Sequence, residues 1–251
     1  MISHHKFNSI HDSEITLPYI QAVHFLRYIL ETDFVKDINF VKNSLILLNS
    51  SNQQQLKYNY PLLLNLTEDI INKTHLLHDL IKQPPNSLFM LIQAGNAALG
   101  FYNHGILTHH KVVRKYMVRK KQGKAQISYL NTKGKSRAGS RIRLANTVKF
   151  FEEINQIITD WLSNQTTDTI IYSCTPQLWG MLFRSKTQTP FVKKDERLKK
   201  LPLDTGIPNF EVLKKAANYC QKGYIEILPD CEENYLEVIK KYLKFLEVDI
   251  K

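Results

Sequence analysis

The chain has 251 residues, 43% hydrophobic and 10% aromatic, which is enough to bury a substantial core and argues against global disorder. Its net charge of +11 favours an anionic partner such as nucleic acid. No apolar run approaches the roughly 20 residues that cross a bilayer, and the N-terminus carries no apolar signal segment, so we expect a soluble, cytoplasmic protein without membrane partners.

The first 86 residues are predicted to form a mostly helical N-terminal region. Apolar residues recur at helical spacing in 19–30 and 38–48, and more loosely in 62–80. The polar run 49–55 is typical of a loop between helices. Pro84 and Pro85 would stop a helix, so the boundary is placed at 82–86.

From residue 87 the pattern changes to short strands. Strands are predicted at 87–95, 96–102 and 106–118, forming an antiparallel meander. A helix at 144–161 follows, then a strand at 169–174 and helices at 176–183 and 210–220, before a strand at 224–228. The apolar stripe of the first of these helices comprises Leu144, Val148, Phe151, Ile154, Ile158 and Trp161. The fold class is therefore α/β with a mixed sheet in a core at 87–230, and 231–251 forms a C-terminal amphipathic helix.

The positive charge is concentrated in one block, residues 111–143. Twelve of the 34 basic residues and no acidic residue lie there, which leaves 22 basic and 23 acidic residues elsewhere. No carboxylate occurs between Asp79 and Glu152. Such a block predicts a surface that binds a polyanion, because unpaired like charges repel one another unless an anionic partner is present.

Within the block, Lys121-Gln122-Gly123-Lys124-Ala125-Gln126 places two glutamines in a glycine-containing basic loop. A glutamine side chain does not titrate near pH 7, but it can orient a water or a ribose hydroxyl for attack. Gly123 allows the backbone to enter a crowded site. Taken alone, the four-residue pattern Gly-x-x-Gln also fits an ordinary turn in a basic surface loop. The three cysteines form no CxxC pair, so neither zinc nor another metal or cofactor is predicted.

The segment 116–126 resembles the signature loop of the Vms/ANKZF-like release-factor family. The resemblance continues through Ala138-Gly139-Ser140 and Asp195-Glu196-Arg197, and covers roughly 87–228 in the expected order. It implies a domain similar to the middle domain of eukaryotic and archaeal peptide-chain release factors. The zinc finger and ankyrin repeats of eukaryotic members are not found, which is typical of a minimal bacterial-type member.

The resemblance implies that Gln126 enters the peptidyl-transferase centre of the large ribosomal subunit, with Lys115 and Arg119 as further catalytic residues. The expected RNA-binding residues are Arg114, Lys120, Lys121, Gln122, Gly123, Lys124, Lys133, Lys135, Arg137, Arg141 and Arg143. Two departures stand at the loop: Lys124 and Ala125 replace a glycine and a serine of the family, and Lys115 replaces an arginine, which unlike lysine binds phosphate through a two-pronged contact.

The function predicted on this basis is a ribosome-associated release factor that frees stalled nascent chains by cleaving peptidyl-tRNA. The cleavage would be made either by a tRNA 3′-end endonuclease, with a 2′-hydroxyl as nucleophile, or by a peptidyl-tRNA ester hydrolase, with water as nucleophile. The sequence leaves both open. The alternative, favoured by Lys124 and Ala125, is a non-catalytic RNA- or ribosome-binding module derived from such a factor.

Overall fold

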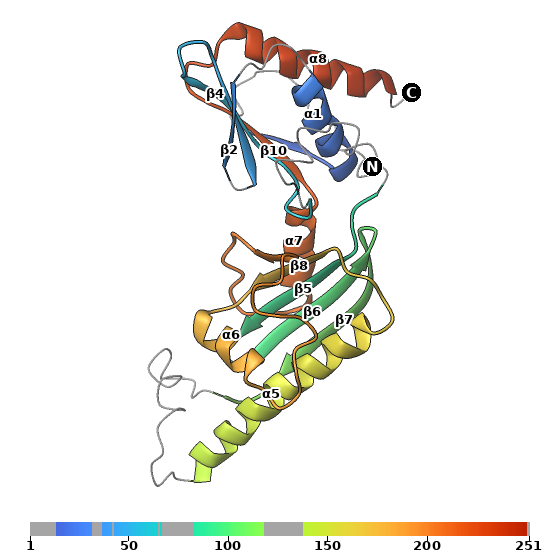
Figure 1. Cartoon of the computed structure of the whole chain (residues 1–251), viewed down its shortest axis with the longest axis vertical. Coiled ribbons are helices and arrows are strands. Elements are labelled where there is room, and N and C mark those ends of the chain that lie inside the picture. The colour runs from blue at the N-terminus through green and yellow to red at the C-terminus, as the bar shows by residue number, and fades with distance from the viewer. Residues whose placement is uncertain are drawn as a thin grey trace. The chain divides into compact units, whose positions relative to one another are not determined.

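The computed structural model describes residues 14–31, 37–41, 43–64, 66, 83–117 and 138–249 (Figure 1). It divides the chain into two compact units. The first combines residues 1–84 with 220–251, and the second consists of residues 85–219. The chain therefore leaves the first unit near the proline pair and returns to it after completing the second.

The first unit is built on a five-stranded antiparallel sheet. In chain order it comprises β1 (Glu14–Leu17), α1 (Tyr19–Glu31), β2 (Asp37–Val41), β3 (Ser44–Leu48), β4 (Gln54–Asn59), β10 (Gly223–Ile227) and α8 (Glu233–Asp249). The strand order is β1-β10-β4-β3-β2. Both helices contribute to its apolar core, in which Phe25 of α1 packs against Tyr58 of β4 and Tyr242 of α8.

Two predictions for the N-terminal part of this unit were wrong. Residues 38–48 form the β2–β3 hairpin and no helix, with Ile38 opposite Leu47. The apolar positions fit either period, but neighbouring β-branched and aromatic residues favour a strand once a sheet can bury alternate side chains. The expected helical region 1–86 thus holds one helix in its described residues; most of 62–80 lies outside them.

The C-terminal boundary is the other correction. The strand expected at 224–228 in the core sheet is β10, which instead pairs with β1 and β4 of the first unit. The helix expected as a separate segment at 231–251 is α8, whose Tyr235, Ile239 and Tyr242 are buried in the core of that unit. Hydrophobic periodicity predicts which elements form but carries no information on their partners. The strand and the helix were therefore predicted correctly as elements but assigned to the wrong part of the fold.

The second unit has the mixed α/β architecture that the sequence predicts. It contains β5 (Ser87–Gln93), β6 (Asn96–Asn103), β7 (Ile106–Arg114), α5 (Ala138–Leu162), β8 (Thr169–Ser173), α6 (Pro176–Phe183), β9 (Leu198–Lys200) and α7 (Phe210–Cys220). The strand order is β7-β6-β5-β8-β9. β5, β6 and β7 form the predicted antiparallel meander, while β8 is parallel to both β5 and β9.

Helices cover both faces of this second sheet. Leu88, Met90 and Ile92 of β5 share one core with Phe150, Ile154 and Ile158 of α5 and with Leu178 and Leu182 of α6. Alternate residues of a strand face opposite sides. On the other side, a Cβ at Gly100 of β6 would lie 2.8 Å from Leu213 of α7. Glycine accommodates this close approach without a shift of the leucine side chain.

Candidate nucleic-acid interface

Most of the predicted site lies outside the described residues. This holds for Gln126 and Arg119 among the expected catalytic residues, and for Lys120, Lys121, Gln122, Gly123, Lys124, Lys133, Lys135 and Arg137 among the expected RNA-binding residues. The structure does describe the two ends of the segment that carries them, at the end of β7 and the start of α5. Arg114, Lys115, Arg141 and Arg143 belong to these ends.

The β7 end, residues 114–117, is held by main-chain contacts on one side and by α5 on the other; we call it the loop root. The Lys115 amide donates a hydrogen bond of 2.9 Å to the carbonyl of Gly95, in the β5–β6 turn. Asn146 of α5 donates from Nδ2 to the Tyr116 carbonyl at 3.0 Å. Met117 is buried in the core of the unit. The backbone leading into the basic loop therefore has a defined position.

Gly95 is required at the loop root for two reasons. Its φ is +81°, a conformation that side chains with a Cβ rarely adopt. A Cβ there would also lie 2.4 Å from the carbonyl oxygen of Lys115. Residues 94–96 and 114–117 line an open cavity of about 280 Å³ at this corner of the sheet. The turn between the first two strands of the meander thus shapes the place where the basic loop begins.

Lys115 forms an ion pair with Glu153 that was not predicted from the sequence. Its Nζ lies 2.8 Å from Oε2 of Glu153 on α5, and both side chains are about one-third exposed. An ion pair as exposed as this contributes at most about 1 kcal/mol, so an RNA phosphate can compete with the carboxylate. Glu153 could have been suspected, since it stands at the end of the acid-free stretch; no sequence signal distinguishes Asn146.

The two predicted RNA-binding residues at the start of α5 differ in exposure. Arg141 is exposed and available to an anion, whereas Arg143 is only 7% exposed, which argues against direct phosphate contact by its guanidinium. Leu144 and Val148, expected in the buried stripe, are exposed, while Phe151, Ile154 and Ile158 are buried as predicted. The physical reason is visible in Figure 1: the N-terminal end of α5 extends past the strands, so it has no sheet to pack against.

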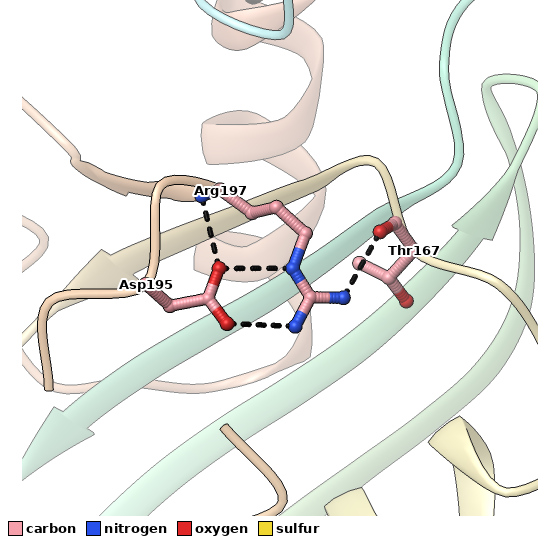
Figure 2. A network of polar contacts seen from close by, with 3 residues as sticks. All are labelled: Thr167, Asp195 and Arg197. Carbon is pink, nitrogen blue, oxygen red and sulfur yellow. Dashed lines mark hydrogen bonds and ion pairs between the residues drawn. The ribbon is translucent and has the colours of Figure 1, made fainter. Parts of the chain in front are cut away.

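The Asp195-Glu196-Arg197 segment has a structural role (Figure 2). Asp195 accepts hydrogen bonds from Nε of Arg197 at 2.9 Å, from Nη2 at 2.7 Å and from its backbone amide at 3.0 Å. Nη1 of Arg197 donates to the Thr167 carbonyl at 3.2 Å, ahead of β8. The side-chain hydrogen bond from Arg197 lowers the pKa of Asp195. The pair fixes the approach of β9 to β8.

A family model, Bacteroidetes VLRF1 release factor, matches residues 87–226, more than half of the chain. The chain belongs to this release-factor family. The resemblance seen in the sequence is thereby confirmed, and the match includes the loop root, the basic loop and α5.

The chain also resembles two curated eukaryotic proteins. It is 33% identical over 144 residues to the tRNA endonuclease VMS1 of Saccharomyces cerevisiae, covering 57% of this chain and 22% of the yeast protein. It is 26% identical over 132 residues to the tRNA endonuclease vms-1 of Caenorhabditis elegans, covering 51% of this chain and 21% of that protein. The matching part spans about a fifth of the length of these relatives.

Two solved structures show a weak similarity to this chain. The Vms1 mitochondrial localization core aligns with a TM-score of 0.42 and 16% identity over 75% of this chain and 77% of that one. Archaeoglobus fulgidus Pelota aligns with a TM-score of 0.28 and 11% identity, covering 80% and 60%. Among the described residues of this chain, no group of three metal-ligating side chains occurs, and no helix is long and apolar enough to cross a membrane.

Proposed function

We propose that this protein is a ribosome-rescue factor that cleaves peptidyl-tRNA on the large ribosomal subunit and so frees stalled nascent chains. The observation that carries the proposal is the release-factor family match across 87–226, which contains the glutamine-bearing basic loop. The relatives named tRNA endonucleases favour cleavage of the RNA over hydrolysis of the peptidyl ester. The exposed cations Arg114 and Arg141 at the two ends of the loop suit an RNA partner.

In this proposal Gln126 orients the nucleophile and Lys115 offsets negative charge on the scissile phosphate. A 2′-hydroxyl attacks the adjacent phosphorus and forms a 2′,3′-cyclic phosphate while its proton passes to solvent water; the bond from phosphorus to the 5′-oxygen breaks, and the leaving oxygen takes up a proton from solvent. The uncharged amide of Gln126 can accept a hydrogen bond from the attacking hydroxyl but cannot remove its proton at neutral pH. The ion pair between Lys115 and Glu153 is weak and partly exposed. Lys115 can therefore leave Glu153 and bind the phosphate instead.

The decisive experiment incubates the full chain with large subunits that carry labelled peptidyl-tRNA and resolves the 3′ end of the tRNA product. A shortened tRNA is expected from the natural protein and none from Gln126→Ala. The matched control is Gln177→Ala, an exposed glutamine at the start of α6, which should cleave normally.

If the natural protein instead releases full-length tRNA, and Gln126→Ala does not, the activity is that of an ester hydrolase and not of an endonuclease. Binding to the subunits without any release of peptide would contradict the proposal and leave the alternative, a non-catalytic ribosome-binding module. The replacement of the family's glycine and serine by Lys124 and Ala125 is the feature that favours this alternative.

A further inference from the structure

A second set of cations lies outside the basic block, on the chain between α6 and β9. We call residues 184–194 the α6–β9 segment. Its first part is a turn followed by bends, and its exposure alternates: Arg184, Lys186 and Gln188 are exposed, whereas Ser185, Thr187 and Thr189 are partly buried. Phe191 is buried, and Lys193 and Lys194 are again exposed. Four cations of this short segment are therefore exposed to solvent.

The α6–β9 segment is held in place by a buried amide of α5. Asn155 is fully buried and donates from Nδ2 to the carbonyls of Leu182, at 3.0 Å, and Thr187, at 2.7 Å. Thr189 donates from Oγ1 to Oδ1 of the same asparagine at 3.4 Å. Phe191 anchors the far part, with its ring 5.8 Å from that of Phe183. The cations therefore stand on an ordered backbone, which lowers the entropic cost of binding.

These cations are not neutralised within the described part of the chain. None of Arg184, Lys186, Lys193 and Lys194 has a described carboxylate within 4.0 Å. Arg184 donates to the Gly180 carbonyl, and Lys193 lies 5.7 Å from the centre of the Phe183 ring. The nearby Asp195 is bound to Arg197, which leaves Glu196 as the exposed acid beside four cations.

The α6–β9 segment and the loop root lie on opposite sides of the same stretch of α5. Glu153 contacts Lys115, and Asn155, two positions later, contacts Thr187. Two residues correspond to a rotation of about 200° around a helix with 3.6 residues per turn, and a helix with its side chains is about 10–12 Å across. An RNA bound at the loop root would therefore have to extend by about the width of one helix to reach the segment.

We propose that the α6–β9 segment binds phosphates of the acceptor arm of the tRNA whose 3′ end enters the basic loop. The inference rests on the proposed function, since it takes the ligand to be tRNA. It adds a second contact surface, formed by Arg184, Lys186, Lys193 and Lys194, on the far side of α5 from the loop root. Proximity to the loop root favours one continuous RNA over a separate partner.

The test measures binding of deacylated tRNA to the full chain as a function of salt, in a Gln126→Ala background so that cleavage does not intervene. Lys186→Gln with Lys194→Gln removes two of the four cations. Each lost phosphate contact should reduce the slope of log K against log salt by roughly 0.7–0.9, so the pair should reduce it by about 1.5. Lys241→Gln with Lys244→Gln on α8 removes the same charge from exposed positions in the first unit and should leave the slope unchanged.

Equal slopes for the Lys186/Lys194 variant and the α8 control would overturn the inference. So would a slope change seen only with large subunits whose tRNA sites are empty, because the surface would then contact ribosomal RNA. Since binding is read without cleavage, these outcomes are distinct from failure of the proposed catalytic activity, which the Gln126→Ala comparison tests by itself.

Discussion

Gly95 is the residue on which the geometry of the loop root depends most directly. Gly95→Ala should lower the free energy of unfolding by about 1–3 kcal/mol, because it combines a positive φ with a Cβ placed 2.4 Å from a carbonyl oxygen. Chemical denaturation measures this. Gly206→Ala is the matched control: its φ is +56° but nothing lies within 4 Å of the added Cβ, so its loss should be smaller. Equal losses would mean that the contact with Lys115 contributes nothing.

Glu153 competes with RNA for the ammonium group of Lys115. Glu153→Gln should strengthen tRNA binding about two- to fivefold at low salt, since the variant removes a negative charge and releases the lysine. The unfolding free energy should fall by less than about 1 kcal/mol, as expected for a partly exposed ion pair. Glu152→Gln removes the same charge without breaking the described pair. If both variants bind tRNA equally well, the stronger binding comes from the change in net charge, and release of Lys115 from Glu153 contributes nothing to it.

The approach of β9 to β8 depends on the Asp195–Arg197 pair. Asp195→Asn should cost about 1–2 kcal/mol of unfolding free energy near neutral pH, because three hydrogen bonds to one carboxylate are weakened. The pKa of Asp195 is lowered in the folded chain, so its contribution is fully present above the ordinary carboxyl pKa of about 4 and is lost as pH falls through the lowered value.

Urea titrations of the natural chain and Asp195→Asn at several pH values check this. Their stabilities should differ by a constant amount above pH about 5 and converge in acid. Glu196→Gln, at the exposed neighbouring carboxyl, should behave like the natural chain at all pH values. A difference between the natural chain and Asp195→Asn that persists undiminished at pH 2 would show that the carboxylate is not the stabilising group.

The first unit is assembled from two distant parts of the chain. β10 lies between β1 and β4, and the backbone amide of Glu232 donates to Oε1 of Gln55 at 2.7 Å, beside a 2.6 Å hydrogen bond from Asn49 to its side chain. In a chain ending at residue 219, the amides of β1, α1, β3 and β4 should therefore lose their protection from hydrogen exchange, while those of β5, β6 and β8 keep theirs as an internal control. Continued protection of the amides in β1, α1, β3 and β4 would show that β10 and α8 are dispensable for that unit.

The sequence by itself determined the family, the meander, the helices and strands of the second unit other than β9, and the position of the basic loop along the chain. These are local properties: the period of apolar residues, the glycine turns, the charge block and a linear motif are all readable without knowing what lies nearby. The release-factor resemblance was recognisable for the same reason, because its motifs are continuous in the chain.

The tertiary structure alone decided the pairing of distant elements. Residues 38–48 matched a helical period but form a hairpin, since β4 supplies a neighbouring strand. β10 joined the first unit because its partners are β1 and β4, a choice no periodicity encodes. Likewise Lys115 meets Glu153, and Asn155 holds the α6–β9 segment, only because α5 packs across the sheet. Such contacts depend on packing between residues far apart in sequence, which local patterns do not specify.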